Sequence, residues 1–228
     1  MKNFKLYILV LSVFVCSSCE KFLETEPFTF TTVNTLYNSP ENAELGLIGC
    51  YSALHNTWFQ GEVGALLTSA GTDEVVTSVG FSDVNYSPFG LLGVTSQNET
   101  IRSNWANLFN AINRVNNLLE NIEKAGVPDP RKVEMISEAR FLRGIHYLYL
   151  AFNYGGVPIY ESAVHAEDAP RASLREVYDF IIADLTFAYE NLPDRAAVQG
   201  RANKWSAAGF LAKTYTYLAS AKINNVGG

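Results

Sequence analysis

The chain has 228 residues, 48% of them hydrophobic and 18% charged, which fits a folded domain and excludes a disordered tail, a collagen-like repeat or a protein with many membrane spans. Seventeen basic against 23 acidic residues give a formal net charge of −6 without any Lys/Arg block, so nucleic acid is not an expected partner. Three cysteines are too few for a disulfide framework.

Residues 1–18 have the pattern of an export signal. Lys2 and Lys5 form a short positive region before an apolar run over residues 6–15, which is too short to span a bilayer. Cys19 then follows the small residues Ser17 and Ser18, as in the box where a bacterial lipoprotein is acylated and cleaved. We therefore expect a lipoprotein signal peptide and a lipid anchor on Cys19, with ordinary secretion as the alternative.

The following segment, residues 19–38, is rich in Thr and is interpreted as an extended tether that leads to a domain over residues 39–228. Ser39, Pro40 and Glu41 supply a helix N-cap, a proline at the first helical position and an acid in the first turn. They predict a first helix that ends near residue 55.

Residues 56–98 lose the helical period and are rich in Gly, Ser and Thr, with aromatic residues scattered among them. A segment of this length without a helix is too long for a simple connector and is typical of a functional loop region.

Helical periodicity then returns and continues almost to the end of the chain. An apolar stripe from Ile101 to Ile122 steps by four and three residues, and residues 131–153 are apolar on more than one face, as in a helix buried on several sides. Ser173 and Glu176 form a capping box that opens another helix. Asn203 caps the last one, whose expected buried stripe is Ala208, Leu211, Ala212, Tyr215 and Leu218.

An internal repeat relates these helices. Phe141-Leu142 matches Phe210-Leu211 at an offset of 69 residues, close to twice the 34 residues of a tetratricopeptide unit. A single helix pair cannot bury its apolar face alone, so stacking is the expected solution. The predicted fold is therefore all-α, with tetratricopeptide-like stacked helix pairs and a long irregular loop region; chance agreement of apolar positions is the alternative.

No signature of catalysis or of a cofactor is present. The sequence has no phosphate-binding loop, nucleophile elbow or HExxH motif, and the three histidines lie far apart without metal-ligand spacing. His146 is interpreted as a hydrogen-bonded core residue and Cys50 as a small buried hydrophobe. We expect no enzyme, no metal site and no cofactor.

Several ordered motifs carry a resemblance to a known family. They are Cys19-Glu20-Lys21-Phe22-Leu23-Glu24, Thr72-Asp73-Glu74, Ile112-Asn113-Arg114-Val115-Asn116, Glu138-Ala139-Arg140-Phe141-Leu142-Arg143, Tyr154-Gly155-Gly156-Val157-Pro158 and Gly200-Arg201-Ala202-Asn203-Lys204. The series resembles the SusD/RagB-type nutrient-binding outer-membrane lipoproteins. Most members are about twice as long, so the resemblance implies that this chain corresponds to the N-terminal helical half and lacks the C-terminal half.

The resemblance implies a lipid-anchored, surface-exposed protein of the outer membrane that captures a glycan and passes it to a SusC-like TonB-dependent transporter. Aromatic rings can then stack on the C–H faces of sugars while polar side chains bond hydroxyls. The candidate ligand-binding residues are in the loop region: Trp58, Asp73, Asn85, Tyr86 and Phe89. Two alternatives stay open: these rings pack as a satellite core, or the protein is a lipid-anchored scaffold that binds a protein or peptide.

Overall fold

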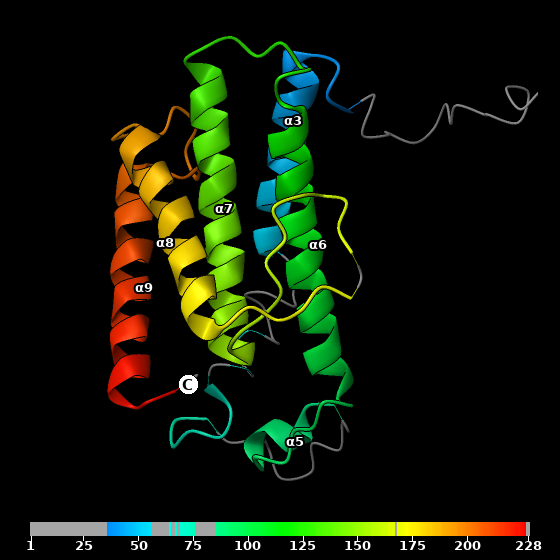
Figure 1. Ribbon diagram of the computed structural model, residues 1–228, viewed down its shortest axis with the longest axis vertical. Helices are drawn as coiled ribbons and strands as arrows, with labels where there is room; N and C mark the ends of the chain where they lie inside the picture. The colour runs from blue at the N-terminus through cyan, green and yellow to red at the C-terminus, as the bar shows by residue number, and fades with distance from the viewer. Residues whose placement is uncertain are drawn as a thin grey trace, which may run out of the picture. The chain divides into compact units, whose positions relative to one another are not determined.

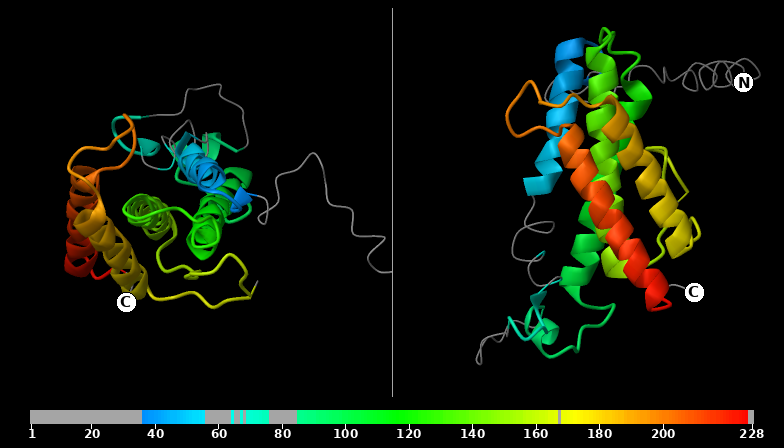
Figure 2. Two further views of the ribbon diagram at one scale, coloured as in Figure 1. Left: turned by 90° about the horizontal axis from the view of Figure 1, so that it is seen from above. Right: turned by 90° about the vertical axis from the view of Figure 1, so that its left-hand side faces the viewer.

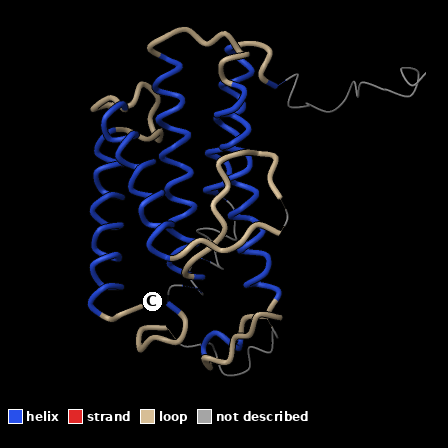
Figure 3. Tube along the Cα trace, viewed as in Figure 1, coloured by secondary structure: helices blue, strands red, loops and turns tan. Residues whose placement is uncertain are grey.

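The computed structural model describes residues 36–55, 64, 67, 69–75, 85–166 and 168–226, all within one compact unit, Val33–Gly228. The signal peptide, Cys19 and Trp58 lie outside the described residues. In the described part the named elements are all helices and no strand is present, apart from one isolated bridge between Ala70 and Val75 (Figure 3). The predicted all-α class is confirmed.

Consecutive long helices pack against one another along the chain (Figure 1). The elements are α3 (Pro40–Ser52), η2 (Ala53–His55), α5 (Ser87–Gly90), α6 (Glu99–Asn121), α7 (Arg131–Tyr154), α8 (Leu174–Asn191) and α9 (Lys204–Ile223). Figure 2 shows α7 between α3 and α6 on one side and α8 and α9 on the other. The predicted stack of helix pairs is confirmed.

Local capping chemistry sets the helix starts at the expected residues. The Ser39 side chain accepts a hydrogen bond from the Asn42 backbone N–H at 3.2 Å, and Pro40 occupies the first turn. Ser173 and Glu176 form the reciprocal capping box of α8, and Asn203 caps α9 through the Ser206 backbone N–H.

The core lies around α7, which is buried on several sides as predicted. Leu142, Tyr147 and Leu150 are 0% exposed, and Cys50 and His146 are buried as expected. Tyr37 also packs in this core, so the packed part of the chain begins before residue 39, where the sequence interpretation ended the tether.

The expected buried stripe of α9 is wrong in part. Ala212 and Tyr215 are exposed, Leu211 is only half-buried, and the fully buried residues are Ala207 and Thr214. The helix is apolar around most of its circumference, so periodicity alone did not identify the face that packs on α8.

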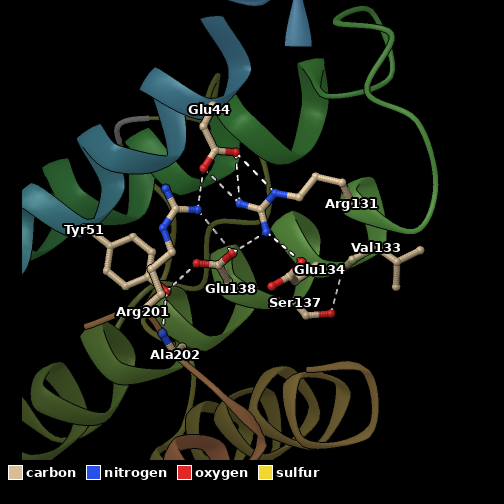
Figure 4. A network of polar contacts seen from close by, with 9 residues as sticks. All are labelled: Glu44, Tyr51, Arg131, Val133, Glu134, Ser137, Glu138, Arg201 and Ala202. Atoms are coloured by element: carbon tan, nitrogen blue, oxygen red, sulfur yellow. Dashed lines mark hydrogen bonds and ion pairs between the residues drawn. The ribbon is translucent and has the colours of Figure 1, made fainter. Parts of the chain in front are cut away.

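A network of charges fixes α3 against α7 and the segment before α9 (Figure 4). Arg131 Nη2 lies 2.9 Å from Glu44 Oε2, and Arg131 Nη1 lies 3.0 Å from Glu138 Oε1. Arg201 pairs with the same two carboxylates. The Tyr51 hydroxyl donates to Glu138 Oε2 at 2.7 Å and accepts from the Ala202 backbone N–H at 2.9 Å.

The carboxylates of Glu44 and Glu138 in this network respond differently to their surroundings. Burial raises the pKa of Glu138, and the Tyr51 hydrogen bond and the two guanidinium groups only partly offset that effect. Burial also acts to raise the pKa of Glu44, but its hydrogen bonds and ion pairs with Arg131 and Arg201 outweigh it and lower the pKa.

Candidate functional site

The described part of the loop region consists of a short turn and α5. The bridge between Ala70 and Val75 closes the turn, within which the Thr72 hydroxyl donates to the Ser69 carbonyl at 2.7 Å. Asp73 is exposed in this turn.

The turn packs directly on α5. Gly71 has φ +84°, and a Cβ there would lie 2.7 Å from Leu92 Cδ2 and 3.1 Å from the Phe89 carbonyl oxygen. A side chain at residue 71 would therefore separate the two segments. The structure thus brings the turn that carries Asp73 next to the helix that carries Phe89.

Two of the other predicted residues lie at the start of α5. Asn85 and Tyr86 are half-buried, and the Asn98 side-chain amide donates to the Asn85 carbonyl at 2.9 Å. Asn98 is also the N-cap of α6, so one side chain ties the loop region to that helix.

The sequence predicts that Phe89 faces outward, but the structure buries it. Its side chain is only 6% exposed, which matches the alternative of a ring packed beneath the loop. The neighbouring Leu91 and Leu92 are large apolar side chains that are exposed, at 77% and 80%. The part of these residues in ligand binding stays a prediction, and Trp58 lies outside the described residues.

A ladder of aromatic rings runs from the end of α7 across α6 to the loop before α8. Trp105 contacts Tyr154 and Phe109 with ring centroids 5.1 and 4.9 Å apart, and Phe109 contacts Tyr160 at 5.4 Å. His165 stacks on Tyr160 at 3.7 Å. The sequence interpretation missed this ladder because its members come from three separate elements, and only their aromatic type was visible.

Side chains of α6 hold that loop in place. The Asn116 amide donates to the Tyr160 carbonyl at 2.8 Å, and the Asn113 amide donates to the Ala163 carbonyl at 2.8 Å. Glu120 accepts from the Ser162 hydroxyl and the Ala163 backbone N–H. These hydrogen bonds hold residues 160–163 of the loop against α6, and Figure 1 shows the loop between α7 and α8 passing across that helix.

A polar cleft opens where η2 approaches α6. It has a volume of about 480 Å³ and is lined by Ser52, Ala53, His55, Asn107, Asn110, Ala111 and Arg114. The Arg114 guanidinium reaches across to the Gly49 carbonyl at 3.3 Å and the Ser52 hydroxyl oxygen at 3.4 Å. Among the described residues no acidic side chain lines this cleft.

The cleft presents hydrogen-bonding groups: the Asn107 and Asn110 amides can donate and accept, and the Arg114 guanidinium can donate. Residues 107, 110 and 114 share one helical face, so the signal for this cleft was the spacing of polar residues by three and four in α6.

Two further observations concern metal ions and membrane spans. Over the described ranges, no three His, Cys, Asp or Glu side chains are grouped in a way that would hold a metal ion. In the same ranges, every helix is too short or too polar to cross a membrane.

Comparison with known proteins identifies the family to which this fold belongs. Residues 59–216 match the model of a SusD-like family described as "Starch-binding associating with outer membrane". The chain belongs to this SusD-like family. A SusD-like protein of Bacteroides ovatus is 27% identical over 98% of this chain and 40% of its own length, and one of Formosa agariphila is 26% identical over 91% and 42%.

Solved structures of this family share the fold. A SusD homologue from Bacteroides thetaiotaomicron has 27% identity and a TM-score of 0.71, covering 82% of this chain and 38% of the other. A laminarin-binding SusD-like protein has 22% identity and a TM-score of 0.72, covering 82% and 42%. The SusD-like chain described here thus spans about 40% of the length of the curated relatives it matches.

Proposed function

We propose that this SusD-like chain is part of a cell-surface lipoprotein that binds a nutrient glycan and passes it to a TonB-dependent outer-membrane transporter. The observation that carries the proposal is the match of residues 59–216 to a family described as starch-binding and associated with the outer membrane. The protein binds its ligand without transforming it and needs no cofactor. In this proposal the partner is a SusC-like transporter, and a lipid anchor on Cys19 attaches the protein to the membrane.

The geometry supports a glycan as the ligand. Sugar rings present apolar C–H faces that aromatic rings cover, and hydroxyl groups that amide and guanidinium groups bond. In the polar cleft, the amides of Asn107 and Asn110 and the guanidinium of Arg114 are the groups that can bond sugar hydroxyls. The lining of the cleft on α6 begins at Asn107, about 14 Å along the helix from the N-cap Asn98, where the aromatic loop region joins.

Isothermal titration calorimetry of the protein against laminarihexaose, maltoheptaose and a panel of other neutral oligosaccharides tests this proposal. We expect saturable binding of at least one of them. Asn110→Ala should weaken it by about 1 kcal/mol, the worth of one hydrogen bond, because Asn110 is an exposed residue of the cleft.

Glu190→Ala is the matched control, because Glu190 is an exposed residue of α8 that does not line the cleft. It should leave the affinity unchanged. No saturable binding of any oligosaccharide would contradict the proposed function, whereas binding that is insensitive to Asn110→Ala would remove only the cleft from it.

A further inference from the structure

The polar cleft where η2 approaches α6 carries positive charge without a matching negative charge. Arg114 lines the cleft, and within the described part of the chain neither Asp nor Glu is among its lining residues. The chain as a whole has the opposite balance, with 23 acidic against 17 basic residues. The cleft is therefore a place on this acidic protein to which a negatively charged group is drawn.

The two arginines of α6 have different partners. Arg102 pairs with Glu99 of the same helix, with Nη1 3.5 Å from Oε2. Arg114 pairs with no carboxylate among the described residues, and its contacts are with a carbonyl and a hydroxyl oxygen of α3. Both arginines are exposed. The positive charge of Arg102 is thus compensated within its own helix, whereas that of Arg114 is not.

The contacts of Arg114 leave most of its donors open. Nη1 makes both of them, to the Gly49 carbonyl at 3.3 Å and the Ser52 hydroxyl oxygen at 3.4 Å, which are long distances for hydrogen bonds. A guanidinium carries five N–H groups in a planar fork. Nε and Nη2 have no hydrogen-bond partner among the residues that the structure describes. Two such donors side by side bind a carboxylate or a sulfate through two oxygens at once.

The groups that line the cleft on α6 follow one another along a single face. Asn107, Asn110 and Arg114 are spaced by three and four residues. Arg114 lies about 6 Å of helix rise beyond Asn110, a length comparable with one sugar residue of an oligosaccharide. The cleft volume of about 480 Å³ is in the usual range of a small-molecule site. A sugar chain that bonds the two amides through its hydroxyls therefore reaches Arg114 with a substituent of the same or the next sugar.

We propose that the polar cleft binds an acidic sugar and that Arg114 pairs with its carboxylate or sulfate group. The inference rests on the proposed function, because it takes an oligosaccharide as the ligand of this cleft. Asn107 and Asn110 bond the hydroxyls that neutral and acidic sugars share. Arg114 adds a charge-assisted hydrogen bond that only the acidic sugar accepts, so the cleft selects among oligosaccharides by their charge.

The alternative role of Arg114 is to stabilise the end of α3. The Gly49 carbonyl lies in the last turn of that helix, where a positive charge is favourable. In that role Arg114 contributes to folding, and its replacement changes the affinity for acidic and neutral sugars alike. The two roles are separated by the ratio of the two affinities, because only direct pairing with the ligand makes that ratio depend on Arg114.

Isothermal titration calorimetry of the protein with matched pairs of oligosaccharides tests the proposal. One pair is an oligogalacturonate and its fully methyl-esterified form, and the other is a sulfated galactan oligosaccharide and its desulfated form. Each pair keeps the sugar backbone and removes the negative charge. Arg114→Gln removes the positive charge, Arg114→Lys keeps it without the planar fork, and Arg102→Gln is the matched control on the same helix. Urea unfolding checks that each variant folds.

We expect the acidic member of at least one pair to bind about fivefold more tightly than its neutral counterpart at low salt, as for an exposed ion pair. The preference should fall at about 1 M salt, where the Debye length is about 3 Å. Arg114→Gln should abolish it, Arg114→Lys should retain part of it, and Arg102→Gln should leave it unchanged. The pair that shows the preference identifies the charged group as a carboxylate or a sulfate.

Three results would overturn the inference. Equal affinity for the charged and neutral members of both pairs, or binding of other neutral oligosaccharides without binding of either pair, would leave glycan binding intact and remove the selection by charge. A preference that persists in folded Arg114→Gln would show that the charge is recognised elsewhere. If neither pair nor any neutral oligosaccharide binds, the proposed function fails together with this inference.

Discussion

Phe141 on α7 and Phe210 on α9 meet edge to face, with ring centroids 5.6 Å apart and planes at 85°. These two residues match each other at the offset of 69 in the internal repeat. Equivalent positions of successive helix pairs thus contact one another directly, as expected when repeated units stack on a continuous core.

The residues that follow them in the repeat, Leu142 and Leu211, are expected to differ in their contribution to stability. Leu142 is 0% exposed, so Leu142→Ala should lower the free energy of unfolding by about 2–5 kcal/mol. Leu211 is half-buried, and Leu211→Ala should cost less than about 2 kcal/mol. Urea denaturation of both variants measures the difference, and a loss below about 1 kcal/mol at Leu142 would contradict the stacked core.

Local signals made the helix starts predictable from the sequence. Ser39, Ser173 with Glu176, and Asn203 act through hydrogen bonds within three residues, so their role is fixed before the helices pack. The multi-sided burial of α7 was equally visible, because a helix without a polar face has to be enclosed.

The packing face of α9 and the candidate site were not predictable in the same way. On α9 the apolar residues extend around the helix, so only the tertiary structure shows that Ala207 is buried and Ala212 exposed. The contact of Trp105 with Tyr154 joins residues 49 positions apart, a pairing that no local pattern encodes. For Phe89, composition indicated a loop aromatic, but burial depends on the turn that packs over it.

His146 is expected to make the protein less stable in mild acid. Burial lowers its pKa to about 4, although the hydrogen bond that Nδ1–H donates to the Leu142 carbonyl at 2.6 Å opposes the shift. In the unfolded chain the pKa is about 6.5, so the unfolded state binds the proton first as the pH falls. Stability should therefore be lost between pH 6.5 and pH 4, by about 2 kcal/mol at pH 5.

Urea unfolding at pH 7 and pH 5 measures this loss. His146→Gln should reduce the pH dependence, and His55→Gln, at an exposed position, should leave it unchanged. Equal pH dependence in the parent protein and in His146→Gln would show that another group carries the effect.

Removing one partner of the buried ion pair between α7 and α8 should destabilise the protein strongly, whereas replacing both partners with apolar residues should destabilise it much less. Arg143 Nε and Nη2 donate to the two Asp184 oxygens at 2.7 and 2.9 Å, and Nη1 donates to Asn116 Oδ1 at 2.9 Å. Burial raises the pKa of Asp184, while Arg143 acts in the opposite direction. Asp184→Ala leaves the guanidinium buried without its carboxylate and should cost about 3–5 kcal/mol.

The double variant Arg143→Met with Asp184→Leu is the informative control. It removes both charges and keeps apolar volume, so most of the lost stability should return. Urea denaturation compares the three proteins. A double variant less stable than Asp184→Ala would show that the ion pair stabilises the fold by more than the free energy needed to bury its two charges.

Cys19 is expected to become the acylated first residue of the mature protein, because the small residues Ser17 and Ser18 precede it. In cells labelled with radioactive palmitate, Cys19→Ala should yield a precursor that is unprocessed or soluble and carries no label. Cys16→Ala is the control and should be processed normally, since the bulky Val15 and Phe14 precede it. Equal labelling of Cys19→Ala would refute the assignment.

Trp58 is expected to contribute a sugar-stacking ring at the start of the loop region. If it does, Trp58→Ala should weaken glycan binding by about 2 kcal/mol, the size of an aromatic hot spot, without a change in folding. Phe152→Ala is the matched control, because Phe152 is a 48% exposed aromatic residue on α7, outside the loop region. Calorimetric titration with the tightest-binding oligosaccharide measures both variants, and circular dichroism checks their folding. Unchanged affinity in a folded Trp58→Ala protein would assign that ring to the satellite core and direct the search to the polar cleft beside Asn110 and Arg114.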